Sequence, residues 1–512
     1  MTKTKRIQIL CLLGAVTLLL SGCWTEAPVE SANGLLGDQE PADQQEEVIL
    51  PAAFTLPYDP DQTLDPVTCA DGMQQVAGSL IYEGLFRLDR QLEPQPWLCQ
   101  SYTYDAASLT YTFTLRSGVT FSDGSPLTAA DAAATLRRAK SSQRDSARLA
   151  HVAAVSAGDG VVIVTLSRPD SSLPALLDIP IVKSGTEESL TPVGTGPYYF
   201  TTDEAGACLA SHSGWWRGES RPAERIALSA ARDREAILYQ FSSHEVQLIT
   251  ADLIGTEPIT ATGNISYEDA DTTVLQFLGF NTARAPFQDS AARRALGLGI
   301  NRETLVSAVL SGHARAAQFP VSPVSPLYPA ELESLYSYDD FAAAMEAAGL
   351  NTGRTRTVTL LVNQENTFKA SAAEHIAQAL SDFDLQIQVE ALPWEEYAAA
   401  LAAGNFDLYY GEVRLPANWD LSALVGTGGS LNYGGWADPQ TEQLLAACAA
   451  AEDRAAALSD LCAYLQQQAP ILPLCFKSSS VLYQTGAVSG LTPTAAEPFY
   501  DLPSCQIHLR QP

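Results

Sequence analysis

A nearly continuous apolar run at Val274–Phe280 predicts a strand buried on both faces. Two helix starts follow it. Asp289 or Ser290 can cap a helix that reaches about Gly299, and Asn301 can cap a second helix after it. A buried strand followed at once by two capped helices indicates a chain that leaves one sheet and begins another part of the fold.

Downstream of this run the apolar spacing changes several times between period two and the helical period. The pattern predicts strands at Thr357–Val362, Leu385–Glu390 and Phe406–Tyr410, and helices at Tyr338–Gly349, Phe368–Leu380 and Trp394–Leu401. Strands that alternate with helices are typical of βαβ units, so we expect a largely parallel sheet here. Two further helices are predicted within Asp438–Gln468.

Upstream, strict alternation over Tyr111–Arg116 predicts a half-buried strand. Thr128 and Asp131 form a capping box that begins a helix ending near Lys140. The remaining elements predicted in this part are a strand at Val161–Leu166, helices at Asp71–Leu80 and Asp233–Phe241, and a strand at Glu245–Thr250.

The N-terminus has the pattern of an export signal. Three basic residues precede an apolar stretch at Ile7–Leu20, which is shorter than the ~20 residues that a membrane-spanning helix needs. The stretch ends at Leu20-Ser21-Gly22-Cys23, which resembles a bacterial lipobox and makes Cys23 the expected lipidated first residue of the mature chain. The alternative is a plain transmembrane helix. We expect residues 1–22 to be the signal peptide and residues 23–50, rich in Pro, Glu and Gln, to be a solvated tether.

Composition excludes several partners. The chain has 512 residues, too many for one core, and a formal net charge of −29, which argues against nucleic acid or anionic lipid as a direct ligand. Of 9 cysteines, Cys11 leaves with the signal and Cys23 takes lipid, so an odd number remains in the mature chain.

Signatures of catalysis and of metal binding are absent from the sequence. There is no CxxC, GxSxG, HExxH or GxGxxG motif, and the six histidines are scattered without an i,i+4 pair. The loop Thr191–Phe200 contains GTGP, but Pro197 lacks an amide donor and the P-loop spacing is missing. Gly194 and Gly196 therefore predict close backbone passage rather than phosphate binding. We expect no enzyme activity, no cofactor and no metal.

Several ordered segments resemble family 5 of the solute-binding proteins, the peptide/nickel class of receptors for ABC importers. They are YTFTLRSGVTFSDGSPLTAADAAATL, TPVGTGPYYF, LGFNTARAPFQDSAARRALGLGINRETL and APILPL. Together with Leu64-Asp65-Pro66 and Tyr82-Glu83-Gly84-Leu85 they cover the chain from about Leu64 to Leu474, nearly the whole folded body.

The resemblance implies an α/β, two-lobed periplasmic-binding-protein-like fold of the class II (cluster C) type, with an extra small domain in lobe one. Lobe one would be residues 51–274, with the small domain at about 86–190, and residues 470–512 would complete it. Lobe two would be residues 275–469. The implied function is capture of an oligopeptide or related solute by hinge closure and delivery to a membrane permease and its ATPase. The protein would be a monomer, anchored by lipid to the outer face of a bacterial cell membrane. A ligand sensor for a membrane receptor and a lipid-anchored hydrolase are the alternatives.

The resemblance also places a ligand site between the lobes. Its segments predict ligand contacts at Asp71, Met73, Trp394, Glu412, Arg414 and Trp419. Peptide-binding members of the family carry an aspartate where this chain has Arg414, and arginine favours a carboxylate or phosphate over an amine. Glu412 could still receive an amine. Arg414 could instead form an ordinary surface ion pair, and Trp394 could be a core residue.

Overall fold

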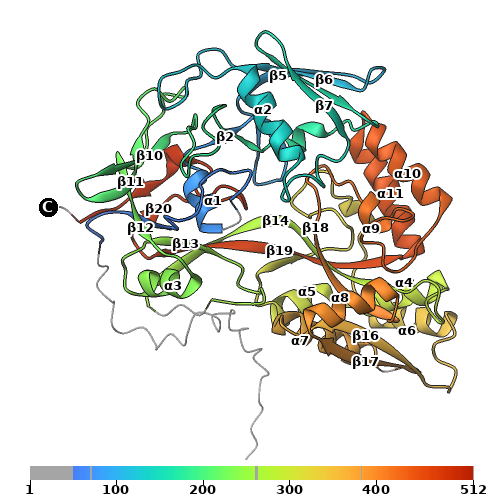
Figure 1. Cartoon of the computed structure of the whole chain (residues 1–512). Coiled ribbons are helices and arrows are strands. Elements are labelled where there is room, and N and C mark those ends of the chain that lie inside the picture. Colours follow the sequence, from blue (N-terminus) through green and yellow to red (C-terminus); the bar gives the residue numbers. More distant parts are fainter. Residues whose placement is uncertain (1–49, 70–71, 260–262, 382, 511–512) are drawn as a thin grey trace, which may run out of the picture.

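The computed structural model describes residues 50–69, 72–259, 263–381 and 383–510. Two long antiparallel strands, β14 (Ile265–Phe280) and β19 (Ile471–Gln484), run through the middle of the molecule (Figure 1). They are central in a seven-stranded sheet of order β13-β19-β14-β18-β16-β17, with β15 (Ala314–Ala316) paired to β19. The predicted buried strand at Val274–Phe280 is confirmed as the C-terminal half of β14, where most side chains are buried.

One side of this sheet consists of alternating strands and helices. The chain passes through β16 (Arg356–Asn363), α7 (Thr367–Ala379), β17 (Leu385–Leu392), α8 (Trp394–Ala403) and β18 (Leu408–Arg414). β16 pairs in parallel with both β17 and β18, whereas β18 is antiparallel to β14. The predicted parallel pairing is confirmed among β16, β17 and β18, which form one part of the seven-stranded sheet. The two long strands join it in antiparallel pairing, and periodicity within single segments carries no information on that pairing.

Helices around these strands begin at polar caps. α4 (Ser290–Leu298) begins at Asp289, whose side chain accepts from the Ala291 amide at 2.8 Å. Asn301 caps a shorter helix than expected, α5 (Arg302–Thr304), which continues as one π-helical turn, η2 (Leu305–Val309). The other helices of this part are α6 (Tyr338–Ala347), α9 (Ser422–Val425), α10 (Pro439–Ala450) and α11 (Arg454–Gln468), with a 3₁₀ turn η3 (Ala330–Leu332).

A second, four-stranded antiparallel sheet lies at the opposite end of the molecule (Figure 1). Its order is β5 (Cys99–Asp105), β6 (Thr110–Leu115), β8 (Val161–Leu166) and β7 (Val152–Ala157). α2 (Ala129–Lys140) packs on β7 and β8 and has the predicted bounds. Asp131 accepts from the Thr128 amide at 3.0 Å and from the Ser184 amide at 3.0 Å, so the capping residue also secures a distant loop.

The third sheet has the order β1 (Thr55–Tyr58), β12 (Arg225–Ala230), β11 (Gly206–Ser211) and β10 (Tyr198–Asp203). Near it lie α1 (Gly72–Gly78), α3 (Arg234–Ser242) and β13 (Leu248–Ala251). The short remaining elements are β2 (Glu83–Gly84), β3 (Phe86–Leu88), β4 (Pro94–Pro96), η1 (Leu173–Leu176), β9 (Pro180–Ile181), β20 (Val488–Ser489), η4 (Leu502–Ser504) and β21 (Gln506–Ile507).

Gly194 and Gly196 lie directly against the backbone of the preceding segment, as the sequence predicts. A Cβ at Gly194 would lie 2.1 Å from the carbonyl oxygen of Ile81, and one at Gly196 would lie 2.6 Å from its carbonyl carbon. The Gly196 amide donates to that same carbonyl at 2.8 Å. Glycine is required at both positions because any side chain would force the two backbone segments apart.

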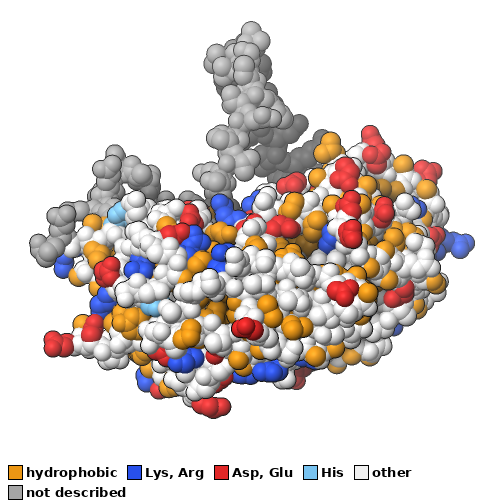
Figure 2. All heavy atoms as spheres, turned by 90° about the horizontal axis from the view of Figure 1, so that it is seen from above, with side chains coloured by type: hydrophobic (Ala, Val, Ile, Leu, Met, Phe, Trp, Pro, Cys, Tyr) orange, Lys and Arg blue, Asp and Glu red, His pale blue; other side chains and the backbone are white. Residues whose placement is uncertain are grey.

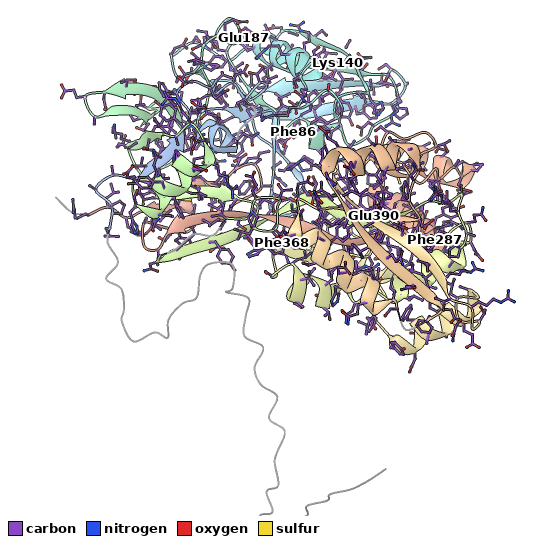
Figure 3. The ribbon with its side chains drawn as sticks, turned by 60° about the horizontal axis from the view of Figure 1, so that its bottom comes forward. Phe86, Lys140, Glu187, Phe287, Phe368 and Glu390 are labelled. Carbon is purple, nitrogen blue, oxygen red and sulfur yellow. The ribbon has the colours of Figure 1, made fainter. Side chains whose placement is uncertain are left out.

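Separate apolar cores stabilise the separate sheets. One surrounds the β16–β18 strands with α4, α6 and α7, and another fills the space between α2 and the β5–β8 sheet. Figure 3 shows Phe287, Phe368 and Glu390 at one end of the molecule and Lys140 and Glu187 at the other. On the face seen in Figure 2, acidic, basic and apolar side chains are intermingled. Within the described ranges, no helix has the length and apolar character needed to cross a bilayer.

Candidate functional site

A large cavity of about 1330 Å³ lies where the separate parts of the chain meet. Its walls come from segments distant in sequence, namely residues 64–97, 144–151, 168–180, 197–219, 272–273, 414–431 and 494–503. Arginines from these walls are Arg87, Arg144, Arg148, Arg168, Arg217 and Arg414. The acidic residues of the lining are Glu83, Asp145, Asp178, Glu219, Asp420, Glu497 and Asp501. The cavity is therefore rich in both charges, and its binding properties depend on which charges are already paired.

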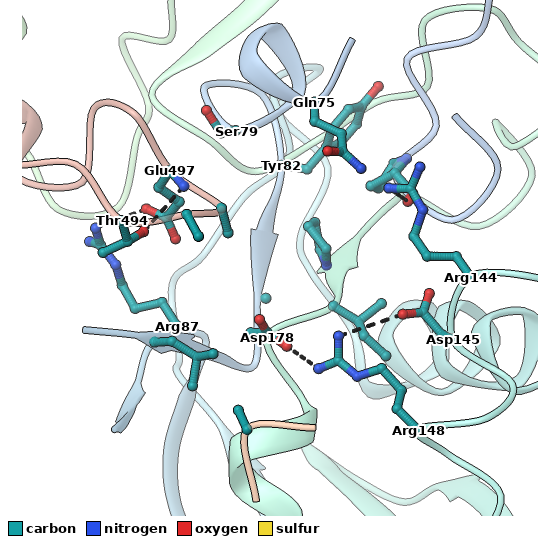
Figure 4. A pocket seen from close by; sticks show the side chains of 18 of the residues that line it. Gln75, Ser79, Tyr82, Arg87, Arg144, Asp145, Arg148, Asp178, Thr494 and Glu497 are labelled. Atoms are coloured by element: carbon teal, nitrogen blue, oxygen red, sulfur yellow. Dashed lines mark hydrogen bonds and ion pairs between the residues drawn. The ribbon is translucent and has the colours of Figure 1, made fainter. Parts of the chain in front are cut away.

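Arg148 is held between two carboxylates. Its guanidinium lies 3.6 Å from Asp145 and pairs with Asp178 (Figure 4). Its terminal nitrogen also donates to the carbonyl oxygen of Leu176 at 2.7 Å. Because Arg148 already pairs with two carboxylates, its positive charge is not open to a ligand.

Arg144 lies beside Arg148 on the same side of the cavity, and its hydrogen-bond partners among the described residues are uncharged (Figure 4). It donates to the carbonyl oxygen of Pro66 at 3.3 Å. With the Gln75 amide turned so that its oxygen faces Arg144, that oxygen accepts from both terminal nitrogens. No carboxylate of the described residues forms an ion pair with Arg144, so its charge remains available to a ligand.

The opposite side of the cavity is closed by the C-terminal segment. Arg87 on β3 lies 2.8 Å from Glu497, and its guanidinium stacks between Trp97 at 4.2 Å and Tyr500 at 3.8 Å from the ring centroids. Burial raises the pKa of Glu497 to about 7, and Arg87 opposes the shift. A cation held between two aromatic faces and one acid fixes the C-terminal segment against β3.

Glu83 on β2 forms a buried polar centre in the cavity wall. Its carboxylate accepts from the indole N–H groups of Trp97, Trp215 and Trp216 at 2.9–3.2 Å. The Thr195 hydroxyl donates at 2.7 Å. Burial raises the pKa of Glu83, while the donated hydrogen bonds favour the charged form and oppose the shift. Trp215 and Trp216 thus have structural roles, because both indoles are fixed to this carboxylate.

Arg414, at the C-terminal end of β18, also lines the cavity. Its backbone pairs with Val274 of β14. Among the described residues, none forms an ion pair or a hydrogen bond with its guanidinium. Desolvation lowers the pKa of Arg414, and Glu412 and Asp252 oppose the shift electrostatically. Arginine nonetheless keeps its charge, so this is a second cation open to the cavity.

Glu412 does not line the cavity. Its carboxylate lies 3.2 Å from Lys369 and 3.4 Å from Lys477, and it accepts from Gln276 at 2.9 Å. Desolvation raises the pKa of Glu412, but the two lysines and Gln276 together lower it by more. The resulting pKa is below the usual value of a glutamate. A carboxylate with two cations has little remaining capacity for the amine of a ligand.

The other predicted ligand residues lie elsewhere. Trp394 is 61% exposed at the first turn of α8, and Trp419 is 2% exposed and packs edge-to-face on Phe476 at 6.0 Å. Met73 is buried in α1, and none of these three is part of the cavity lining. Asp71 and Cys23 lie outside the described residues. The structure therefore brings only Arg414 of the predicted set to the cavity, as far as the described residues show.

Sequence reasoning missed most of the residues that line the cavity. Arg87 comes from the short strand β3, and Arg144, Arg148 and the segment 494–503 come mostly from turns and loops; none of them carries a motif. The one available signal was the pair of arginines four residues apart after α2, in RDSAR, which by itself predicts only a solvated turn. Among the described residues there is no cluster of three His, Cys, Asp or Glu side chains able to hold a metal ion.

Comparisons with known proteins agree on one family. The model of bacterial extracellular solute-binding proteins, family 5, matches residues 93–432. The glutathione-binding protein GsiB of Escherichia coli K12 is 28% identical over 357 residues, which are 66% of this chain and 69% of that protein.

Solved structures share the fold. The nickel ABC transporter structure from Bacillus halodurans superposes with a TM-score of 0.73 at 21% identity, covering 87% of this chain and 98% of that one. The oligopeptide-binding protein AppA of Bacillus subtilis, in complex with a nonapeptide, gives a TM-score of 0.60 at 18% identity, covering 90% and 100%. The chain has the mixed α/β fold of periplasmic binding proteins.

Proposed function

The chain belongs to family 5 of the bacterial extracellular solute-binding proteins, and on this premise we propose that it captures a small acidic solute in the cavity around Arg414. It is a non-enzymatic component of an ABC importer that acts outside the cytoplasm. The observation that carries the proposal is that Arg414 and Arg144 face one cavity without a carboxylate partner among the described residues.

Charge pairing inside the cavity supports an acidic ligand. Arg87, Arg148, Arg168 and Arg217 each have a carboxylate partner. Of the acidic residues that line the cavity, Asp501 has neither a cation nor a buried set of donors among the described residues, and its side chain accepts from the Ser504 hydroxyl. The acid group of a ligand could pair with either of two open guanidiniums. A guanidinium forms bidentate hydrogen bonds with a carboxylate or phosphate.

The volume of the cavity fits an oligopeptide or a compound of similar size. Pockets for drug-sized ligands usually measure about 300–1,000 Å³, and this cavity is larger. Among the relatives, one is named for glutathione and one was solved with a nonapeptide. We propose a ligand of this kind with one or two free acid groups, oriented by Arg414 and Arg144.

Closure of two lobes is the proposed mechanism. Lobe one comprises residues 51–274 with a small domain at about 86–190, and residues 470–512 complete it, while lobe two comprises residues 275–469. In support, β14 crosses the boundary between the two lobes, and β19, at the return to lobe one, is hydrogen-bonded to it over much of its length. Two paired strands can flex together as a hinge, so that ligand contacts from both lobes form only in the closed state.

Anchoring at the membrane completes the proposal. Cys23 carries the lipid after removal of residues 1–22, and residues 23–50 tether the folded body to the membrane. Two or more acyl chains give firm anchoring. The tether would let a monomeric receptor deliver its ligand to a permease and ATPase in the same membrane.

The test is a ligand screen read by thermal unfolding and small-angle scattering. Glutathione, acidic and amidated tripeptides, and a nickel complex of a carboxylate chelator form the panel. A true ligand at a hundred times its Kd stabilises the folded state by about 2.7 kcal/mol and compacts the protein. We expect the compounds with free acid groups to do so and their amidated counterparts to fail. Equal responses to acidic and amidated compounds would contradict the acidic-ligand proposal, and no response to any compound would contradict the cavity as the binding site.

A further inference from the structure

The tip of the β3–β4 hairpin is buried in a core that is otherwise built from another part of the chain. Leu92, in the turn between these strands, is 5% exposed and belongs to an apolar cluster whose other members all lie between Leu275 and Phe476. Its backbone φ is +62°, in the left-handed region that disfavours side chains with a Cβ. Glu93 beside it approaches the Ser325 hydroxyl at 3.5 Å.

A second contact between the same two parts follows β8. The side chain of Arg168 donates to the Asp420 carboxylate at 2.5 Å, and the Asn418 amide donates to Asp170 at 3.0 Å. The backbone amide of Ser171 donates to the carbonyl oxygen of Ala449 at 2.9 Å. These interactions join the loop Arg168–Ser171 to the turn Asn418–Asp420 and to the end of α10.

Backbone strain is present on both sides of this interface. Trp419, between the two contacting residues Asn418 and Asp420, has φ +54° and is anchored by its buried indole against Phe476. Leu92 is the left-handed residue on the other side. Left-handed conformations of bulky residues are costly and persist where surrounding contacts enforce them, often at switch regions. Leu92 precedes Glu93, which approaches Ser325. Trp419 lies between Asn418 and Asp420, which contact the loop Arg168–Ser171.

We propose that the Leu92 tip and the loop Arg168–Ser171, which we call the latch, hold the small domain against lobe two and set the population of the closed state. This role of the latch depends on lobe closure, which is part of the proposed function. Leu92, Arg168 and Asp420 also line the cavity, so the latch lies at the edge of the ligand site. Its residues are positioning residues: they stabilise the closed arrangement, which brings Arg414 toward Arg144.

The latch can be opened and restored by exchange of charge. Arg168→Glu and Asp420→Arg each place like charges together, and the double variant restores an opposite-charge pair. The readout is hydrogen exchange of the Ser171 amide in the ligand-free protein, because its bond to Ala449 exists only while the latch is closed. Loss of a charge-assisted hydrogen bond predicts roughly tenfold to a hundredfold faster exchange in each single variant. Exchange near the wild-type rate is expected in the double variant.

Matched controls separate the latch from general loosening. Arg232→Glu breaks an exposed ion pair with Asp61 outside the cavity and should leave the Ser171 amide unchanged. Leu92→Gly should open the latch, whereas Leu109→Gly relieves a left-handed leucine that packs within the small domain and should not. The amides of β6 report whether each variant remains folded.

The outcomes distinguish this proposal from the proposed function. Unchanged Ser171 exchange in both single variants, or failure of the double variant to restore it, overturns the latch. Restoration by the double variant supports it even if the ligand panel finds no ligand, because the measurement uses ligand-free protein. A ligand that compacts the protein while all latch variants exchange like wild type would leave the proposed function standing without the latch.

Discussion

The guanidinium of Arg87 lies 2.8 Å from the carboxylate of Glu497 and joins a strand near the start of the folded body to the segment near its end. The guanidinium also stacks on the ring of Tyr500, at 3.8 Å from the ring centroid. The C-terminal segment thus forms a wall of the cavity, and its position depends on a titratable group. This relationship leads to the first prediction.

The stability of the protein should depend on the protonation of Glu497. Burial raises its pKa from the ordinary 4.5 to about 7, so the folded state binds a proton that the unfolded state has lost between these values. The contribution of this group to stability is therefore present below pH 4.5 and is lost as the pH rises toward 7. In Glu497→Gln that loss is absent. We expect the unfolding free energy of the wild type, relative to the variant, to fall between pH 4.5 and 7 in urea titrations.

The matched control for this prediction is Glu245→Gln, at an exposed position. Its difference from the wild type should not change over the same pH range. A constant difference between wild type and Glu497→Gln would show that Glu497 titrates at its ordinary pKa.

Replacement of Glu83 should destabilise the folded state. A glutamine there has one acceptor oxygen and two donor hydrogens, which face three indole N–H groups and a hydroxyl that all donate to the native carboxylate. At least one buried donor loses its acceptor, which costs about 1–3 kcal/mol. Urea unfolding of Glu83→Gln, compared with the exposed Glu204→Gln, measures the effect. Equal stability of the two variants would show that the four donors find other acceptors.

Arg414 should contribute to ligand affinity without contributing to stability. Because no carboxylate among the described residues forms an ion pair with it, Arg414→Ala removes a charge that is open to direct pairing with a ligand. Loss of a charge-assisted pair weakens binding by roughly tenfold to a hundredfold. Calorimetric titration with the best acidic compound of the panel measures this effect, and Arg232→Ala is the control at an ion pair outside the cavity. If Arg414→Ala binds as tightly as the wild type, the acid group lies elsewhere.

Lipid attachment should depend on Cys23 alone among the N-terminal cysteines. Cys23→Ser removes the thiol that receives the lipid, so the protein should lose its acyl mass and leave the membrane fraction. Cys11→Ser, within the signal segment, should be lipidated like the wild type. Mass spectrometry of the processed N-terminus distinguishes the two. Membrane retention of Cys23→Ser after cleavage of the signal would argue for a different anchor.

Much of the local structure could be predicted from the sequence. The helix at Ala129–Lys140 has its expected bounds because Thr128 and Asp131 are capping residues within one turn of each other. Val161–Leu166 is likewise a strand with the predicted bounds, since its alternation matches the pleat. Caps and period-two alternation depend on residues close together in the chain. Such local signals can therefore be read without knowledge of the tertiary fold.

Pairing between distant segments could not be predicted in the same way. β19 spans Ile471–Gln484 and is almost entirely buried, yet the sequence indicated only a short apolar return at its beginning. Its polar residues, such as Lys477 and Ser480, are buried because Asp252 and Asp269 lie next to them in space. Hydrophobic patterning cannot identify a buried strand whose polar side chains are neutralised by remote partners.

The sequence by itself determined the family, the helix caps and the presence of an arginine at position 414. Only the tertiary structure decided which charges remain open to a ligand. Glu412 and Arg414 are two residues apart on one strand, and successive residues on a strand alternate between its faces, so both point to the same side. Two lysines pair with Glu412, whereas Arg414 has no carboxylate in an ion pair with it among the described residues and lines the cavity. The fold brings Lys369 and Lys477 against Glu412 from other elements, and remote contacts of this kind cannot be read from the local sequence.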